Sequence, residues 1–355
     1  MKFGKLLIAI MMVGVLLSLG APDVQADKTF KIGVIMPLSG QLSVDGANEA
    51  NGAKMAAEDI NAQGGIKVGG ENYKVELIVY DDQAIPKESA AAMEKLATRD
   101  GVKMVIGPFT SSACLASMPI AAREKIVMSS PNASSAKLTE VGNKWFFRGG
   151  MTISNGLTMA VGFAKQLGMN SLSYIAANDE WGRNSVAQFK EAHDKNNTKV
   201  VSIDYFDHGT TDFYSVLTTI KGKKPGGILA IMETKVFAIF LRQAKEICPE
   251  LKILDSGGVM PFAFVKLVPP AISEGAYCFS IGPPLDHKSV VHLVKRYRDK
   301  YSTDPSSYFF SGYDVMMIFR DALQRAGTVD DRDKIREVMT KTDYQGIIGR
   351  YNFDA

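Results

Sequence analysis

The sequence is poor in the residues that build metal centres and redox sites. Its 355 residues include only three cysteines and four histidines. Neither set has the spacing of a metal site, so we predict no metal and no cofactor. The histidines are His193, His208, His287 and His292, and the cysteines are Cys114, Cys248 and Cys278. Cys248 and Cys278 either pair as a disulfide or, like Cys114, pack as small buried hydrophobes.

The chain also lacks an excess of charge of one sign. Its formal net charge is +3, from 41 basic and 38 acidic residues. The longest basic run, Lys221-Gly222-Lys223-Lys224, is typical of a solvated turn. We therefore expect no nucleic-acid partner.

Beyond the N-terminus, the sequence has no apolar run long enough to cross a bilayer. The N-terminus has Lys2 and Lys5, then the apolar run Leu6–Leu19, then the small residues of Val24-Gln25-Ala26. This order predicts a secretion signal over residues 1–26, cleaved before Asp27, with a membrane anchor as the alternative. Because no cysteine lies near the cleavage point, a lipid anchor is not expected. We predict a soluble mature protein in the periplasm.

Motifs of the common two-domain α/β enzymes are missing from the sequence. The pairs Gly64-Gly65 and Gly69-Gly70 stand between a helix and a strand, which is the wrong order for a phosphate-binding loop. The sequence has no Gly-x-Ser-x-Gly elbow. Asp81-Asp82 follows an expected strand, where capping of the loop is favoured over a catalytic pair of carboxylates. We predict a protein that is not an enzyme.

What the sequence does contain is a regular alternation of apolar strands and amphipathic helices. Near-continuous apolar strands separated by helices form parallel sheets covered on both faces, so the predicted fold class is α/β and doubly wound. In the first series the strands are Phe30–Met36, Tyr73–Tyr80, Met104–Ile106 and Ile126–Met128, and the helices are Ala47–Ala62, Lys87–Arg99 and Ala113–Glu124.

The regularity breaks around Lys144–Met151 and a second series follows. Its helices are Asn155–Leu167, Gly182–Asp194, Asp212–Lys221, Thr234–Ile247 and Pro261–Leu267, and its strands are Ser171–Ala176, Lys199–Phe206, Gly227–Met232, Leu251–Leu254 and Gly275–Ser280. Three long helices (Asp286–Tyr301, Ser306–Ala326, Asp330–Thr340) and a strand at Tyr344–Phe353 end the chain. Because the second series has its own helices, we expect these last ones to cover the first sheet. The predicted lobes are 27–147 plus 282–355, and 148–281.

Hydroxyl residues cluster after two neighbouring strands of the first series. Thr110-Ser111-Ser112 follows the strand Met104–Ile106, and residues 129–135 follow the next strand. The carboxyl ends of parallel strands form the ligand-binding edge of an open sheet. Serine hydroxyls beside the free N–H groups of a helix start are suited to a carboxylate. These residues either bind a ligand or only cap helices, and two such loops side by side favour a binding site.

Several short motifs occur together in this order. They are Lys31-Ile32-Gly33-Val34, Pro37-Leu38-Ser39-Gly40, Ala57–Ile66, Tyr80-Asp81-Asp82, Val105-Ile106-Gly107-Pro108, Ser130-Pro131-Asn132-Ala133-Ser134, Asn178-Asp179-Glu180-Trp181-Gly182 and Thr211-Asp212-Phe213. Over nearly the whole mature chain, this set resembles the type I periplasmic substrate-binding proteins of the branched-chain amino acid and amide ABC transporter family. The resemblance implies two doubly wound lobes joined by a hinge, with the ligand in the cleft between them.

The resemblance also implies site residues. Ser111, with Ser112 beside it, and the loop residues Asn132, Ala133 and Ser134 would hold the ligand carboxylate. In the family, an aromatic residue and a glutamate of the second lobe hold the ammonium group. This chain departs from that pattern, because Gly257 stands at the place of the glutamate.

Two further departures bear on the ligand. Glu233 stands where the family has the partner aromatic residue, and Asp45 replaces an aromatic residue of the first loop. We expect Glu233 to bind the ligand's amino group, with Asp45 helping from the opposite lip, or else Glu233 only begins the helix Thr234–Ile247. Trp181 follows a strand and begins a helix, so it lies either in the cleft or in the core.

The expected function is capture of a small amino acid-like ligand, with a branched-chain amino acid or related amide favoured and an aromatic or other small carboxylate as the alternative. The expected partner is an ABC permease in the cytoplasmic membrane, and the expected state is a monomer. A ligand-sensing subunit for a membrane receptor uses the same closing cleft and remains the rival. Family chains continue past the strand that matches Ile347–Phe353, so either this sequence is truncated or the last hinge strand is absent.

Overall fold

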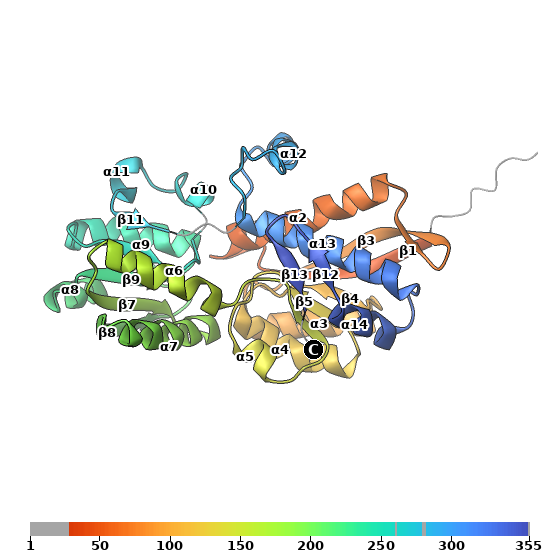
Figure 1. Ribbon diagram of the computed structural model, residues 1–355, viewed down its shortest axis with the longest axis horizontal. Helices are drawn as coiled ribbons and strands as arrows, with labels where there is room; N and C mark the ends of the chain where they lie inside the picture. Colours follow the sequence, from red (N-terminus) through yellow and green to blue (C-terminus); the bar gives the residue numbers. More distant parts are fainter. Residues whose placement is uncertain (1–27, 260, 279–281, 354–355) are drawn as a thin grey trace, which may run out of the picture.

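The computed structural model describes residues 28–259, 261–278 and 282–353, and it contains two α/β lobes side by side (Figure 1). The predicted signal sequence and its cleavage point before Asp27 lie outside these residues. Each lobe is a mainly parallel sheet with helices on both faces, as predicted. None of the described helices is both long and apolar enough to cross a membrane.

The first sheet has six strands in the order β2-β3-β1-β4-β5-β6. All neighbours are parallel except β2, which pairs antiparallel with β3 and was not predicted. The order reverses between β1 and β4, which creates a switch point in the sheet. The strands are β1 (Lys28–Met36), β2 (Ile66–Val68), β3 (Glu71–Asp81), β4 (Met104–Ile106), β5 (Val127–Ser130) and β6 (Phe146–Arg148).

Helices cover this sheet on both faces. Successive side chains of its strands point to opposite faces, and both faces carry apolar side chains. Ile32 and Val34 pack in the apolar cluster that includes α2 and α13, whereas Ile35 packs in the cluster that includes α3 and α4. The helices are α2 (Ser43–Ala62), α3 (Pro86–Thr98), α4 (Ser111–Arg123), α5 (Lys137–Glu140), α13 (Ser307–Ala326) and α14 (Arg332–Thr340). Glycines let α2 and α13 approach closely, since a side chain at Gly52 would overlap the Phe309 carbonyl and one at Gly312 the Glu49 carbonyl.

The second sheet has five strands in the order β11-β10-β9-β7-β8, all parallel. Its strands are β7 (Ser171–Ala177), β8 (Lys199–Phe206), β9 (Gly227–Ile231), β10 (Ile253–Asp255) and β11 (Ala276–Tyr277). The helices are α6 (Ile153–Gln166), α7 (Glu180–Lys195), α8 (Tyr214–Gly222), α9 (Thr234–Ile247), α10 (Pro261–Phe264) and α11 (Pro270–Ser273). The strand predicted at Gly275–Ser280 is shorter in the structure, and its last two residues lie outside the described part.

The C-terminal segment returns to the first lobe, where α13 packs along α2 and α14 packs against α13. The helix α12 (Val291–Tyr301) also packs there, with Val294 and Tyr297 against Met55 of α2. It begins five residues later than predicted, because residues 287–290 form a turn in which the Val290 N–H donates to the His287 carbonyl. The residue boundaries proposed for the lobes stay a prediction.

One predicted strand is wrong, and the alternative left open for two cysteines is resolved. The segment Tyr344–Phe353 is not one strand but a hairpin of β12 (Asp343–Gln345) and β13 (Arg350–Asn352), closed by a Gly346 N–H to Gly349 carbonyl bond. Cys248 and Cys278 do not form a disulfide, since all three cysteines are free. Both instead pack against the same apolar cluster of the second lobe.

The hairpin is held to α13 by one buried carboxylate. Asp314 Oδ1 accepts a hydrogen bond from the Ile347 N–H at 2.8 Å. Its Oδ2 accepts from the Ile348 N–H at 3.0 Å and from the Tyr351 hydroxyl at 3.1 Å. Three donors from one hairpin converge on this side chain, so Asp314 is its anchor.

We expect Asp314→Ala to lower the free energy of unfolding by about 1–3 kcal/mol for each buried donor left unpaired. The amides of residues 343–352 should exchange hydrogen faster. Urea unfolding and hydrogen exchange measure the two effects. The control is Asp343→Ala, which removes the half-exposed ion pair with Arg350 and should cost less than about 1 kcal/mol. Equal losses in the two variants would contradict the anchoring role.

Candidate functional site

A cavity of about 240 Å³ lies where the carboxyl ends of the two sheets face each other. Both lobes contribute to its walls, and its volume lies below the usual range for drug-sized ligands, so it suits a small molecule. The lining residues are Phe109, Thr110, Ser111, Pro131, Asn132, Ala133, Ser134, Met151, Thr152, Ile153, Asp179, Trp181, Ser185, Phe189, Glu233, Ser256, Gly257, Gly258 and Tyr308. No lysine, arginine or histidine is among these described lining residues.

The first-lobe wall is made of hydroxyl groups at the start of α4 and the loop after β5. Thr110 is the N-cap of α4, and its Oγ1 accepts from the Ala113 N–H at 3.3 Å. Ser111 Oγ accepts from the Ser135 N–H at 3.3 Å, which ties the two loops together. The positive end of the helix and these hydroxyls make this wall suited to a carboxylate.

Arg148 at the end of β6 supports the loop from behind. Its guanidinium donates to the carbonyls of Ala133 at 3.0 Å and Ser135 at 2.8 Å. Burial lowers the pKa of Arg148, yet an arginine keeps its charge at neutral pH. These bonds hold the carbonyls of Ala133 and Ser135 in place, and they bring a positive charge near the first-lobe wall.

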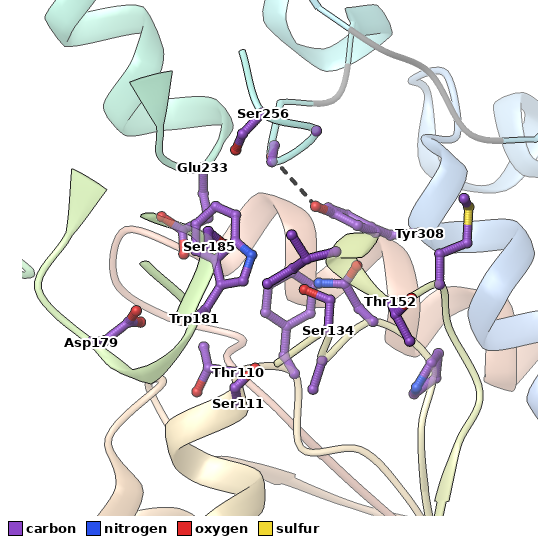
Figure 2. Close-up of a pocket in the computed structure, with 18 of the residues that line it drawn as sticks. Thr110, Ser111, Ser134, Thr152, Asp179, Trp181, Ser185, Glu233, Ser256 and Tyr308 are labelled. Carbon is purple, nitrogen blue, oxygen red and sulfur yellow. Dashed lines mark hydrogen bonds between the residues drawn. The ribbon is translucent and has the colours of Figure 1, made fainter. Parts of the chain in front are cut away.

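The second-lobe wall carries two acidic side chains, Asp179 and Glu233 (Figure 2). Asp179 is satisfied, because it accepts from the Gly182 N–H at 2.8 Å and lies 3.1 Å from His208 Nε2. Glu233 is only 4% exposed, and its Oε2 has no hydrogen-bond partner in the described part of the chain. Burial raises the pKa of Glu233 to about 8, and repulsion from Asp179 adds to this. Glu233 is therefore a buried acid in need of a donor.

Beside Glu233 the loop after β10 presents Ser256, Gly257 and Gly258 to the cavity. Asp255 shapes this loop by accepting from the N–H groups of Gly257 at 2.9 Å and Gly258 at 3.1 Å. Burial nevertheless raises the pKa of Asp255 to about 8. Ser256 Oγ is buried and has no partner among the described residues, so the wall holds a second unused polar atom close to Glu233 (Figure 2).

Aromatic rings form the apolar part of the cavity. Phe109 and Tyr308 stack edge to face, with centroids 5.1 Å apart. The Tyr308 hydroxyl donates to the Gly258 carbonyl at 3.4 Å, which joins α13 to the second lobe (Figure 2). Trp181 lines the cavity and also packs on both apolar clusters of its lobe, so both alternatives predicted for it apply.

The two lobes are in direct contact around the cavity. On one side Thr234 Oγ1 donates to Asp45 Oδ1 at 3.0 Å, and Lys235 Nζ donates to Ser43 Oγ at 2.7 Å. On the other side the Glu180 carboxylate accepts from the Ser135 hydroxyl at 3.1 Å and from Lys137 Nζ at 3.4 Å. These contacts describe a closed cleft.

Of the predicted site residues, Ser111, Asn132, Ala133, Ser134, Trp181 and Glu233 line the cavity. Asp45 and Ser112 do not line it; both lie in the contacts between the lobes. Asp45 accepts from Thr234, and Ser112 Oγ accepts from the Glu180 N–H at 3.3 Å. Asp45 and Ser112 therefore take part in the contact between the lobes and not in the wall of the cavity.

Sequence reasoning missed several lining residues. Asp179 and Ser256 each follow a strand of a parallel sheet, which is the signal by which Thr110 had been included among the candidate hydroxyl residues. Tyr308 had no such signal, because it comes from a helix far along the chain. Asp81 and Asp82 lie outside the cavity: Asp81 holds the loop at Leu38, and Asp82 accepts from the Ala84 N–H, as the capping interpretation predicts.

A cavity enclosed between two α/β lobes, at the carboxyl ends of both sheets, defines the class of two-lobed solute-binding proteins that close around a ligand. Comparison with known families agrees. The model of the periplasmic binding protein family matches residues 29–355, and the chain belongs to this family.

Individual relatives point the same way. The Leu/Ile/Val-binding protein of Escherichia coli (strain K12) is 28% identical over 332 residues, with 91% of this chain and 86% of the relative covered. A second relative is LivJ of Streptococcus pneumoniae, the substrate-binding protein of a branched-chain amino acid transporter, which was solved with isoleucine. LivJ is 26% identical to this chain, with 92% of each chain covered and a TM-score of 0.83. A solute-binding protein of Rhodopseudomonas palustris, solved with 3,4-dihydroxybenzoic acid, is 22% identical with a TM-score of 0.79, over 92% of this chain and 89% of that one, and shows the fold alone.

The wall between Trp181 and the β10 loop has no spare room. A Cβ at Gly258 would lie 2.5 Å from the Met232 carbonyl oxygen and 2.7 Å from Trp181 Cη2. We expect Gly258→Ala to push the indole into the cavity and to lower the free energy of unfolding by about 1–3 kcal/mol. Tryptophan fluorescence and thermal unfolding report the change. The control is Gly222→Ala, where the added methyl group meets nothing within 4 Å; equal effects of the two substitutions would contradict this packing.

Proposed function

We propose that the protein captures a small zwitterionic or amide-bearing ligand by closing its two lobes, and that a branched-chain amino acid is the leading candidate. The observation that carries this proposal is the polarity of the cavity. Hydroxyls and a helix start lie on one wall, and an unsatisfied carboxylate lies on the other. A ligand with a carboxylate at one end and an amino group at the other complements both walls.

Glu233 is the residue we assign to the amino group. It occupies the N-cap position of α9, yet its side chain makes no capping hydrogen bond, so helix capping does not account for it. A buried carboxylate without a donor is costly, and a ligand ammonium supplies both a donor and a positive charge. The names of relatives that bind leucine, isoleucine and valine support the same ligand class.

The wider role we propose is that of the extracytoplasmic component of an ABC importer. Residues 1–26 are removed after Ala26, the mature protein works as a monomer in the periplasm, and an ABC permease receives the ligand. Residues 27–147 plus 282–355 move as one lobe and residues 148–281 as the other. The ligand is bound and released unchanged. A sensing subunit for a membrane receptor would share all of these features except the permease.

One observation favours a second ligand class. With a pKa of about 8 in the closed cavity, Glu233 keeps its proton at neutral pH unless a cation pairs with it, and a neutral carboxyl group donates a hydrogen bond. The rings of Phe109, Trp181 and Tyr308 line the same cavity. A small aromatic carboxylate therefore fits as the alternative ligand, with its ring against these walls.

We expect Glu233→Gln to weaken binding of an amino acid by about 1.5–3 kcal/mol, the range for a charged hydrogen bond. Isothermal calorimetry measures it, with Glu246→Gln, an exposed substitution on α9, as the control that leaves affinity unchanged. Binding of an aromatic carboxylate should change less, because the glutamine amide donates a hydrogen bond as the neutral carboxyl group of Glu233 does. Unchanged affinity for an amino acid in Glu233→Gln would remove this residue from the site.

Thermal unfolding of the mature protein should identify the ligand class. A ligand at a hundredfold excess over its dissociation constant stabilises the folded protein by about 2.7 kcal/mol. The screen contains amino acids, amides, ureas and aromatic acids, and each hit is recovered and analysed after incubation. Recovery of a converted product would refute binding without chemistry.

A further inference from the structure

Two acidic side chains of α2 are buried beside the contact between the lobes. Asp45 and Glu49 lie one helical turn apart on the same face, and both are fully buried. Asp45 Oδ1 accepts from the Thr234 hydroxyl of the second lobe. Asp45 Oδ2 and both Glu49 oxygens have no hydrogen-bond partner among the described residues. The binding cavity does not use either side chain.

The surroundings of the pair do not neutralise two negative charges. Lys235 lies near Asp45, but its ammonium donates to Ser43 Oγ instead. Glu233 lies near enough to interact with Asp45 and brings no positive charge, Tyr308 is a neutral hydroxyl, and His208 pairs with Asp179. Asp255, the other buried acid facing Tyr308, is held by backbone N–H groups.

Only one of the two acids depends on the position of the lobes. Glu49 lies where α13 packs tightly on α2, since a side chain at Gly312 would overlap its carbonyl. Asp45 is in the first turn of α2, and its cover comes from Thr234 and Lys235 of the second lobe. Separation of the lobes removes that cover and returns the Asp45 carboxylate to water.

We propose that closing of the cleft takes up a proton at Asp45, so that pH sets the balance between the open and closed forms. This inference rests on the proposed function in one respect only, namely that the lobes open and close. The inference adds the uptake of one proton to the closing step. That proton is bound in the first lobe, outside the ligand cavity.

The direction of the pH dependence follows from the surroundings of Asp45 in the closed and open forms. Burial raises the pKa of Asp45 to about 7 in the closed form, and burial with repulsion from Asp45 raises the pKa of Glu49 well above its usual range. In the open form Asp45 has an ordinary carboxyl pKa of about 4. The closed form therefore binds more protons. The closed-to-open ratio rises up to about tenfold per pH unit as pH falls from about 7 towards 4, and it is constant above pH 7.

The first test needs no ligand, so its failure is distinct from failure of the proposed function. Small-angle X-ray scattering of the mature protein at pH 8.5, 7.0 and 5.5 measures the mean separation of the lobes. We expect the radius of gyration to fall as the pH falls in the natural sequence and to respond less in Asp45→Asn, where Glu233 still takes up a proton on closing. It should be constant in the double variant Asp45→Asn with Glu233→Gln. Thr234→Val, which removes the hydroxyl and keeps the acid, should retain the pH response.

A radius that does not change with pH in the natural sequence would overturn the proposal. The same holds if Asp45→Asn responds to pH as the natural sequence does, because the response would then come from another group.

The second test counts protons on binding of an amino acid found by the thermal screen. Calorimetry at pH 7.5 in two buffers of different ionisation enthalpy gives the number of protons taken up. Glu233 releases a proton when an ammonium pairs with it, so the variant Glu233→Gln isolates the uptake at Asp45. We expect uptake of a fraction of a proton in Glu233→Gln, rising below pH 7, and none in the double variant with Asp45→Asn. No uptake in Glu233→Gln at any pH between 5.5 and 7.5 would contradict the proposal.

Discussion

Parallel pairing of the strands is the constraint on which the rest of the structure depends. In a parallel sheet every strand ends at the same edge. The loops after β4 and β5 therefore lie together at one edge of the first sheet, and those after β7, β9 and β10 lie together at one edge of the second. Two such sheets with their carboxyl ends facing each other enclose a cavity between them. The chemistry of that cavity is then decided by the first one to three residues after each strand.

Burial of carboxylates is an energetic cost of this arrangement. Asp255 is compensated by backbone N–H groups, and Asp179 by the Gly182 N–H and His208. Glu233 Oε2, Asp45 Oδ2 and both Glu49 oxygens lack a donor among the described residues. Groups left unsatisfied in a folded protein call for a functional account, and both sets lie where the lobes meet. We propose the ligand's ammonium as that account for Glu233 and a proton for Asp45.

The sequence was sufficient for the main alternation of strands and helices and for the hydroxyl residues of the first-lobe wall. Ser111 and Asn132–Ser134 were predictable because hydroxyls after parallel strands must share an edge. Asp45 was placed in the cavity by the resemblance, whereas the structure puts it one layer outside, in contact with Thr234. That difference depends on how the lobes rotate against each other, which no local pattern encodes.

Tyr308 shows a second limit. Its place in the site depends on the return of α13 to the first lobe and on one contact with the Gly258 carbonyl, across a sequence separation of 50 residues. The hairpin after α14 was missed for a related reason. The alternation of apolar and polar residues in Tyr344–Phe353 suits one strand. In the structure a hydrogen bond between Gly346 and Gly349 closes a turn in this segment, and the buried Asp314 accepts hydrogen bonds from N–H groups of that turn. Long-range hydrogen bonds overrode the local period in that segment.

The exchange of an acid between two positions has a geometric consequence for selectivity. The resemblance drawn from the sequence implies a glutamate in the β10 loop, where this chain has Gly257, and this chain has Glu233 after β9 instead. The two strands are neighbours in the sheet, so the charge moves sideways by about one strand spacing, roughly 5 Å, while the first-lobe wall stays in place. If Glu233 holds the ammonium group as proposed, a zwitterion held at both ends lies at a different angle, and its side chain points towards a different part of the wall formed by Trp181, Phe189 and Tyr308. Retention of a zwitterion by this site is therefore compatible with a side-chain preference that differs from that of its relatives.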